Sequence, residues 1–574
     1  MAPDLRNIRH EAIRNPVQKR LEKAFKALLI GAIGICIVVP FLMLLLQAFV
    51  EGEITQEFVL RPTFETFAQT ISEPIFQDVL LHTLMFTVGT VVIAHVLGFV
   101  FAYILTRMEI PFQSTFHTLM FLPIFVSPLV LALGYSFAFS EGGIYHTVLS
   151  TFMTPISIKN IWGMIGVGSI WLVPFAYSFI SAGLQNIDPE MEDAGRLTGA
   201  QERTILREIS IPLLKPFVLS SLFLTVLLTL QAVSVPAILG LSNRIYILAT
   251  YILGLQGRSV PPPYGKMAAV GVIMVVISLF IVFIIQRIIG DVSEYTVITG
   301  RGRERNFYTS PHKKFLAVSF LGLYVLLFIV IPFSQVLLVG FTTPNSVVPF
   351  SFSDLSMRWF LEVYNQSTFS LAIQNSVLIA VVTASVAVVV TGMMSYLALR
   401  EEGLASRALN TITWIPIATP GIVLGLAYLW AVLVFDVGLY GTIYVLMLAF
   451  FIRFSALGMR MNSSLISQQA VEIDEQAKVC GAALFSRLRN VIFPNAKSGM
   501  MSVWVILFTL YMNELSTSIF LYAADSRVIT VTVFNLWRTA QFGPLGALST
   551  IQVFITLTVV TALIVLFDID IKAV

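Results

Sequence analysis

Two polar segments with matching residues interrupt a chain that is otherwise largely apolar. They are Glu192–Pro212 and Asp474–Pro494, and in each a Gly-Ala pair, beginning at Gly199 or Gly481, is followed by a proline thirteen residues after the glycine. Neither segment combines a nucleophile and a base at a spacing typical of catalysis. The chemistry that they offer is recognition of another protein. One such segment could be an ordinary cytoplasmic loop, whereas two copies favour a docking element with the same geometry in both.

The first copy has the residues of a short helix that is too polar to lie in lipid. Asp188 is a candidate N-cap, and Pro189 suits the first helical position. Acids follow at once and bases come later, which suits the helix dipole. Gly199 interrupts the helical pattern and predicts either a bend or a close approach of the backbone. Pro212 would set the entry into the next apolar span.

A second group of candidate residues lies within a predicted membrane span. Glu514 interrupts an uncharged run and has polar neighbours at Asn513, Ser516 and Thr517. Acids inside a membrane face a bundle interior or a wet cavity, so Glu514 is a candidate gate or cation-contacting position on a translocation path. A hydrogen bond between helices is the alternative. In the first half of the chain Gln231 matches Asn513 and the position matching Glu514 is apolar, so the path would be asymmetric in charge.

Neither a metal site nor a nucleotide site is expected. His82 and His95 lie in one predicted span but are thirteen residues apart, which is not the spacing of a helical metal pair, so we expect them to make structural hydrogen bonds. No G-x4-G-K-[ST] motif occurs, so the chain itself should bind no ATP. Energy for transport would come from a separate subunit or from an ion gradient.

Composition places the chain among membrane proteins. Its 574 residues are 57% hydrophobic and 12% charged, its mean hydropathy is +0.86, and a soluble domain would carry about 25% charged residues. Residues 27–50, 216–243 and 315–353 contain no Asp, Glu, Lys or Arg. Each stretch exceeds the roughly 20 residues that cross a bilayer. The expected fold is an all-α polytopic membrane protein that contacts lipid and proteins, with no nucleic acid as a partner.

The chain repeats itself, which indicates two halves of one design. The matching pairs are I-V-V-P-F at 37–41 with I-V-I-P-F at 329–333, F-A-Y-I-L-T-R at 101–107 with M-S-Y-L-A-L-R at 394–400, Tyr135 with Tyr428, and Lys215 with Lys497. We predict a first half at residues 1–290, a linker at 291–311 and a second half at 312–574. About twelve transmembrane helices would then form two parallel six-helix repeats, with one solute path between the halves.

Each half is predicted to contain six spans. They lie near 25–49, 79–106, 115–139, 160–184, 214–240 and 267–289, and near 315–341, 371–399, 409–435, 438–459, 497–522 and 546–568. Basic residues before the first span and around the linker should be cytoplasmic by the positive-inside rule. Both termini, the linker and both polar segments would therefore lie on the cytoplasmic side.

The polar segments resemble the coupling-helix signature of ABC importer permeases, E-A-A-x3-G-x9-I-x-L-P. The resemblance places the ATPase-coupling residues at Glu192, Asp193, Ala194, Gly195, Gly199 and Pro212, and at Glu475, Gln476, Ala477, Gly481 and Pro494. The glycine and the proline are intact in both copies, whereas the E-A-A triplets and the I-x-L endings depart from the signature. We call residues 189–212 the first coupling segment and residues 471–494 the second coupling segment.

The resemblance covers nearly the whole chain and implies a fused, type I ABC importer permease of the bacterial cytoplasmic (inner) membrane. V-S-V-P-A-I-L-G at 233–240 and N-E-L-S-T-S-I-F-L at 513–521 are similar to the ferric-iron/thiamine group. Such permeases work with two copies of a cytoplasmic ABC ATPase, which hold ATP and Mg²⁺, and with a periplasmic or extracellular solute-binding protein. Ferric iron is the first expected solute, and thiamine, phosphonate, polyamine and sugar phosphate are alternatives.

Two other classes of protein remain to be weighed. A secondary transporter driven by an ion gradient would need charged residues inside the membrane, and Glu514 is expected to be nearly alone there. An intramembrane enzyme would need a catalytic pair in the bilayer, and the sequence shows none. We therefore expect a transporter subunit that is not itself an enzyme.

Overall fold

The computed structural model describes residues 16–50, 62–152, 154, 156–257, 259–289, 310–342, 355–401 and 403–567. The predicted linker lies almost wholly outside these ranges, as do the first fifteen residues. The chain divides into two compact units. Unit 1 comprises residues 1–60, 371–528 and 554–574, and unit 2 comprises residues 61–370 and 529–553.

The described part of unit 2 is helical. Its helices are α3 (Glu65–Ser72), α4 (Pro74–Arg107), α5 (Gln113–Phe125), α6 (Pro128–Ala138), α7 (Ile144–Ser150), α8 (Ile161–Asn186), α9 (Pro189–Leu197), α10 (Glu202–Ile205), η1 (Leu206–Ser210), α11 (Ile211–Leu230), α12 (Ser234–Gly240), η2 (Leu241–Asn243), α13 (Leu248–Gln256), α14 (Tyr264–Ile289), α15 (Pro311–Val325), η4 (Leu326–Val330), α16 (Ile331–Gly340), α17 (Arg358–Asn365) and α28 (Ile529–Arg538).

The described part of unit 1 is also helical. Its helices are α2 (Pro16–Phe49), α18 (Ser367–Arg400), α19 (Leu404–Ile412), α20 (Trp414–Ala418), α21 (Gly421–Phe435), α22 (Ile443–Ser467), α23 (Val471–Val479), α24 (Leu484–Arg487), η6 (Leu488–Ile492), α25 (Phe493–Asn495), α26 (Lys497–Met512) and α27 (Ser518–Leu521). The last helix, α29 (Phe542–Phe567), is shared between the two units.

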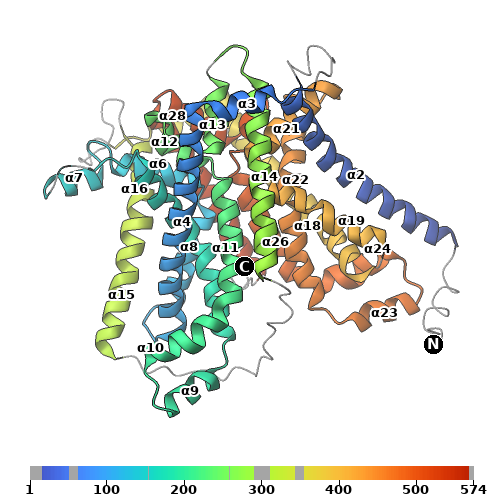
Figure 1. Ribbon diagram of the computed structural model, residues 1–574, viewed down its shortest axis with the longest axis horizontal. Coiled ribbons are helices and arrows are strands. Elements are labelled where there is room, and N and C mark those ends of the chain that lie inside the picture. Colours follow the sequence, from blue (N-terminus) through green and yellow to red (C-terminus); the bar gives the residue numbers. More distant parts are fainter. Residues whose placement is uncertain are drawn as a thin grey trace. The chain divides into compact units, whose positions relative to one another are not determined.

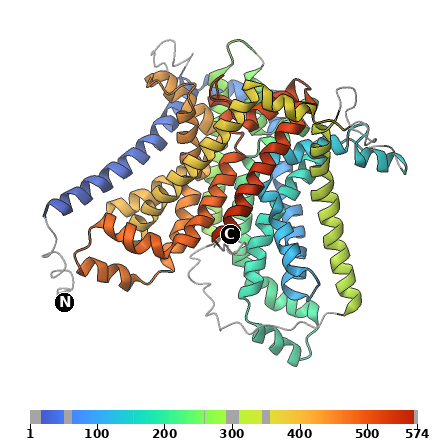
Figure 2. The ribbon, with the colours of Figure 1, turned by 180° about the vertical axis from the view of Figure 1, so that it is seen from behind.

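Unit 2 consists mainly of the first half of the repeat and unit 1 mainly of the second half, but each unit contains the first long helix of the other half. In unit 2, α15 from the second half packs with α4 and α8 from the first half, and Figure 1 shows these long helices alongside one another. Phe101 of α4 lies with its ring centroid 4.5 Å from that of Tyr324 in α15. In unit 1, α2 from the first half packs with helices of the second half, which Figure 2 shows from behind. The predicted halves describe the sequence repeat, and the compact units combine parts of both.

A tyrosine holds the exchanged helix in each unit at the same place. The prolines of the repeated I-V-x-P-F motif, Pro40 and Pro332, lack the N–H that would bond the carbonyl four residues earlier. Those carbonyls accept hydrogen bonds from tyrosine hydroxyls instead: Cys36 from Tyr428 at 2.6 Å in unit 1, and Phe328 from Tyr135 at 3.0 Å in unit 2. The repeated tyrosine therefore satisfies a backbone group that the repeated proline leaves open.

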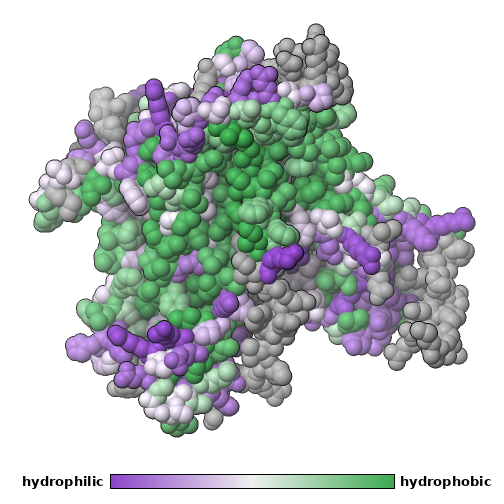
Figure 3. Space-filling view, viewed as in Figure 1, coloured by the Kyte–Doolittle hydropathy of each residue, from purple (hydrophilic) through white to green (hydrophobic). Residues whose placement is uncertain are grey.

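Helix length and hydropathy agree with a membrane protein. Among the described residues, nine helices are long and apolar enough to span a bilayer, and four further pairs pass the same test together but bend by more than 40°. Figure 3 shows a largely hydrophobic surface over the long helices of unit 2, with hydrophilic residues gathered where α9 and α10 lie. The predicted all-α polytopic fold is confirmed.

Four predicted spans differ in detail from the structure. The segments predicted at 115–139 and 409–435 are pairs of helices bent by 98° and 107°. In each, a proline at the bend, Pro128 or Pro420, keeps the preceding residue extended and ends the first helix. The helices predicted at 214–240 and 497–522 end at Leu230 and Met512 and resume after a break.

Candidate functional site: the two coupling segments

The first coupling segment begins as its sequence predicts. Asp188 is the N-cap of α9, and its carboxylate accepts the backbone N–H of Glu190 at 2.9 Å. Pro189 is the first helical residue. The helix then carries Glu190 and Glu192 in its first turn and Arg196 in its last, which stabilises the helix dipole. The predicted N-cap is confirmed.

Both coupling helices end in the same hydrogen-bonded turn. Gly199 and Gly481 have φ values of +85° and +80°, the left-handed region that glycine adopts without strain. The residue after each glycine donates its N–H to the carbonyl five residues earlier, at 3.1 Å in the first copy and 3.0 Å in the second. This is a Schellman motif. A Cβ on either glycine would meet no atom within 4 Å, so the glycines serve the turn and not a close backbone approach.

One acid in each coupling helix is buried and anchors it to its own unit. These residues are Glu192, which is 3% exposed, and Asp474, which is 1% exposed. Both precede the helix-ending glycine by seven residues. Burying a carboxylate is costly unless it is paired and hydrogen-bonded, so the groups around these two acids determine how each helix is held.

Glu192 is held by residues from α4 and η1. The Arg107 guanidinium, at the end of α4, lies 2.9 Å from Glu192 Oε1. The Ser210 hydroxyl donates to the same oxygen at 3.1 Å. Arg196, one turn further along α9, approaches the other oxygen at 4.0 Å and pairs with Asp193 at 2.6 Å. The ion pair Arg107–Glu192 thus joins the second span of the half to its coupling helix.

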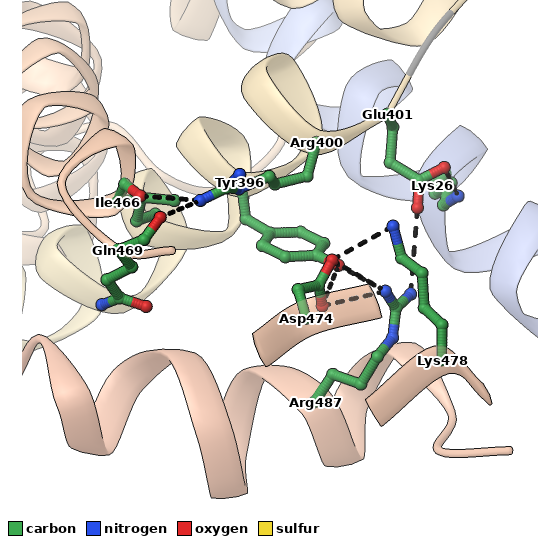
Figure 4. Close-up of polar contacts among 9 residues, drawn as sticks. All are labelled: Lys26, Tyr396, Arg400, Glu401, Ile466, Gln469, Asp474, Lys478 and Arg487. Carbon is green, nitrogen blue, oxygen red and sulfur yellow. Dashed lines mark hydrogen bonds and ion pairs between the residues drawn. The ribbon is translucent and has the colours of Figure 1, made fainter. Parts of the chain in front are cut away.

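Asp474 is held by a different set of residues, shown in Figure 4. The Tyr396 hydroxyl, from α18, lies 2.9 Å from both carboxylate oxygens. The Arg487 guanidinium, from α24, lies 3.1 Å from Oδ1 and is fully buried. Lys478, one turn along α23, approaches Oδ2 at 3.1 Å. Arg487 also lies 2.5 Å from the tyrosine oxygen, so the three groups form one compact cluster.

A repeated arginine caps backbone carbonyls in both units. Arg107 donates to the carbonyl of Leu184 at 3.0 Å, and Arg400 donates to the matching carbonyl of Ile466 at 3.1 Å. Arg400 also donates to the carbonyl of Gln469 at 2.7 Å. These carbonyls lie at the end of the fourth span, where helical partners run out. The same arginine position therefore fixes the approach to the coupling helix in both halves, and in the first half it also neutralises the buried acid.

The outer faces of the two coupling helices match at four positions. At four matched positions both helices expose the same kind of side chain, an acid, an apolar residue, a second acid and a second apolar residue. The exposed residues are Glu190, Met191, Asp193 and Leu197 in α9, and Glu472, Ile473, Glu475 and Val479 in α23. The repetition of exposed apolar residues at the same two positions makes this face a candidate interaction surface.

The remaining predicted coupling residues divide between the two faces. Ala194 and Gln476 are exposed with the acids of the triplets, whereas Gly195 and Ala477 are half-buried. A Cβ on Gly195 would lie 3.1 Å from the Ile209 side chain, so a small residue there lets η1 pack closely. Pro212 and Pro494 are exposed near the start of the following helices. The ATPase-coupling role of all these residues stays a prediction.

Several residues of the anchors were not predicted from the sequence. In the sequence Arg107, Arg400 and Tyr396 stand out only as repeat matches, and their place at the end of the second span in both halves is the signal that marks them. Asp474 marks the start of the second polar segment but was not assigned a role. Arg487 has no such signal, because the matching position in the first half is Ile205.

The predicted path residues lie where the fifth helix of each half breaks. Gln231 and Asn513 are the C-cap residues of α11 and α26. Glu514 is buried, and its carboxylate accepts the backbone N–H of Thr517 at 2.8 Å. Ser516 and Thr517 are buried beside it. The structure thus brings the polar residues of the second half together around a helix break, which membrane proteins tolerate where the backbone is buried in protein or lines a water-filled cavity.

The expectation that Glu514 stands nearly alone is wrong. Arg453, in the middle of α22, lies 3.0 Å from Glu514 and donates to the Thr517 hydroxyl at 2.9 Å. Its guanidinium fills the space left by Gly421, where a Cβ would overlap it. A basic residue inside a predicted apolar span was the available signal. The pair is a contact between helices, as the structural alternative for Glu514 expects, and the place of Glu514 on a translocation path stays a prediction.

His95 makes the structural hydrogen bonds expected of it. Its Nδ1 lies 2.8 Å from the carbonyl oxygen of Val91, and its Nε2 lies 3.0 Å from the Ser221 hydroxyl. The two contacts join α4 to α11 within unit 2. The ring is thus used for packing two helices together.

Comparison with known proteins identifies a matching family and several relatives. A profile of the family described as "Binding-protein-dependent transport system inner membrane component" matches residues 94–294 and 388–572, one match in each half of the repeat. The chain is 24% identical over 549 residues to the ferric transport system permease protein FbpB of Actinobacillus pleuropneumoniae, covering 93% of this chain and 76% of that protein.

Other relatives cover less of the chain. A putative ferric transport system permease protein of Haemophilus influenzae is 24% identical over 77% of this chain and 69% of its own length. A putative 2-aminoethylphosphonate transport system permease protein of Salmonella typhimurium is 28% identical over 30% of this chain and 66% of its own length. Among solved structures, a bacterial ABC transporter involved in alginate import aligns at 20% identity over 47% of this chain and 96% of that chain, with a TM-score of 0.39.

The two family matches span most of both repeats and include both coupling segments and both helix breaks. They agree with the internal duplication, the helical membrane fold and the matched Schellman turns. The chain belongs to the family of binding-protein-dependent transport system inner membrane components.

Proposed function

We propose that this importer permease forms the solute path of an ABC transporter and that its two coupling segments dock two equivalent ATPase subunits. The observation that carries the proposal is the matched outer face of α9 and α23, with acids and apolar residues exposed at the same four positions. A repeated surface suits a repeated partner. ATP and Mg²⁺ would be held by the ATPases, and this chain would bind neither.

The positions of the basic residues support a cytoplasmic location for both coupling segments. In unit 2, Lys314 at the start of α15 pairs with Glu109 at 3.0 Å, just beyond the helix end that holds Glu192. In unit 1, Lys26 near the start of α2 pairs with Glu401, beside the second coupling segment. Basic helix ends mark the cytoplasmic face of a bacterial inner membrane. Both termini would then also be cytoplasmic.

The solute is proposed from the relatives. Proteins named as ferric transport permeases align with most of this chain. Ferric iron is therefore the first candidate. Thiamine, phosphonate, polyamine and sugar phosphate remain candidates, and the phosphonate relative covers part of the chain. A solute-binding protein outside the membrane would deliver the solute and carry most of the selectivity.

The direct test is to purify the tagged chain in mild detergent from cells with native levels of its partners and to identify what accompanies it. The proposal expects a P-loop ATPase, with one copy for each coupling segment, and a solute-binding protein expressed with it. Recovered solute-binding protein can then be tested for ferric iron by titration. A chain that purifies alone and transports in proteoliposomes under an ion gradient would contradict the proposal.

A further inference from the structure

The cytoplasmic end of α2 contacts the second coupling segment directly. The Glu22 carboxylate of α2 accepts the backbone N–H of Leu484 at 2.8 Å, and Leu484 is the first residue of α24. The preceding residue, Ala483, has no side-chain oxygen with which to cap this helix. Helix N-termini leave N–H groups open and favour a nearby negative charge. Glu22 therefore serves as the cap of a helix that lies more than 460 residues further along the chain.

A second contact joins α2 to the buried cluster. Lys26, one turn beyond Glu22, pairs with Glu401 Oε2 at 2.8 Å, and the other oxygen of Glu401 lies 3.9 Å from Arg487. Arg487 in turn neutralises Asp474 of the coupling helix. Figure 4 shows this run of alternating charges from Lys26 through Glu401 and Arg487 to Asp474. Charges in contact in this way hold one another in place more firmly than isolated surface pairs do.

Unit 2 also contains a lysine–glutamate pair near the start of its exchanged helix, and this pair is more exposed. Lys314 of α15 and Glu109, just after α4, lie 3.0 Å apart, with side chains 34% and 68% exposed, whereas those of Lys26 and Glu401 are 20% and 24% exposed. In unit 2 the cation at the buried acid is Arg107, from the same half of the sequence as the coupling helix. In unit 1 the cation is Arg487, which lies within reach of the pair made by the exchanged helix.

We propose that the cytoplasmic end of α2 is a positioning element for the second coupling segment, acting through Glu22 and Lys26. The N-terminal helix of the first half thereby controls the rigidity of the docking helix in the second half. The positioning itself rests on the contacts within unit 1. Its consequence for transport rests on the proposed function, because it assumes that an ATPase pushes on α23.

The native cysteines allow the positioning to be measured without any partner. Cys480 is exposed and is the C-cap of α23, whereas Cys36 is partly buried in α2. In a Cys36→Ser background, a nitroxide label on Cys480 reports the mobility of the second coupling helix. Glu22→Ala and Lys26→Met, alone and together, should each increase the mobile fraction of its spectrum.

The matched control uses the first coupling segment. Thr198 is the exposed residue equivalent to Cys480, so Thr198→Cys in a cysteine-free background places the same label on α9. Lys314→Met should leave the mobility of this label unchanged, and Lys26→Met should do the same. Size-exclusion profiles establish that each variant is folded. Unchanged mobility at Cys480 in both α2 variants would overturn the proposal.

Transport supplies the second readout. With the purified ATPase and binding protein in proteoliposomes, Glu22→Ala combined with Lys26→Met should lower solute taken up per ATP hydrolysed by roughly two- to fivefold, the range of modest ion-pair and capping effects. Lys314→Met should leave this ratio unchanged. Binding of no ATPase to the unmodified chain would refute the proposed function while the spin-label comparison still decides the positioning. If the label mobility changes but the solute taken up per ATP hydrolysed does not, the proposed effect of α2 on transport is wrong.

Discussion

The two coupling segments are alike on the outside and different on the inside. Their exposed faces repeat acids and apolar residues at the same four positions, and both helices end in the same glycine turn. The buried acids occupy the same position, but Glu192 pairs with Arg107 from the second span, whereas Asp474 pairs with Arg487 from the helix that follows it. A surface that meets the same partner twice is expected to stay the same, while an anchor has only to fit its own unit.

The two buried acids differ in length as well as in partners. Glu192 is one methylene longer than Asp474 and reaches the arginine at the end of the second span. The shorter Asp474 contacts the Tyr396 hydroxyl and Arg487 instead, and Arg400 donates from Nη2 to two backbone carbonyls. The anchors differ in the residues that make them but each leaves a buried carboxylate paired.

The largest difference between the halves should come from neutralising the buried acids. Asp474→Asn leaves the fully buried Arg487 without its closest anion and should lower the free energy of unfolding by about 3–5 kcal/mol. Glu192→Gln should cost less, because the Arg107 side chain is partly accessible to water and keeps its bond to a carbonyl. Denaturant titrations in mixed micelles measure both.

A control separates the charge from the packing. Adding Arg487→Met to Asp474→Asn removes both charges of the pair and should recover most of the lost stability, since paired removal avoids an uncompensated buried charge. Equal losses for Asp474→Asn and Glu192→Gln would show that the two anchors do not differ as described.

A smaller difference should separate the two repeated arginines. Arg107→Met removes a carbonyl bond and the cation beside Glu192, whereas Arg400→Met removes carbonyl bonds only. Arg107→Met should therefore cost about 1–3 kcal/mol more, the penalty for leaving a buried polar group unsatisfied. The same titrations test this, with Glu192→Gln in the Arg107→Met background as the control that should close the gap. A larger loss for Arg400→Met would reverse the assignment.

The smallest effects should be equal in the two halves. Gly199→Ala and Gly481→Ala each force a side chain into the left-handed region and should cost about 1–2 kcal/mol, with no contribution from steric clash because the space around both glycines is open. Asparagine, which tolerates this conformation, should cost less at both positions. Unfolding measurements check the pair, and clearly unequal alanine losses would mean that the two turns are not equivalent.

The sequence predicted those features that repeat or that follow from apolar length. Most of the spans, the helix N-cap at Asp188 and the positions of Gly199 and Gly481 depend on local rules, and the structure agrees with them. Pro128 and Pro420 are local signals for the two bends, but the length of the apolar segments around them predicts single continuous spans. The exchange of first helices between the units has no local signal, because it depends on which distant surfaces pack together.

The residues that pair with the buried acids could not be predicted from the sequence for a related reason. Arg487 holds Asp474 only because α24 turns back toward α23, and its counterpart in the first half is an isoleucine, so comparison of the halves does not reveal it. Arg453 and Glu514 come from different spans and become a pair only when α22 packs beside the break after α26. Both pairings depend on tertiary contacts that spacing along one chain does not encode.

The central claim is that α9 and α23 present equivalent surfaces to equivalent ATPase subunits. The most direct measurement is the rate at which a maleimide labels Cys480 in a Cys36→Ser background, or Thr198→Cys in a background that lacks both native cysteines, with and without the purified ATPase. The account predicts that the ATPase slows labelling at both positions to a similar extent. Unchanged labelling at both positions, or protection of one position alone, would contradict it.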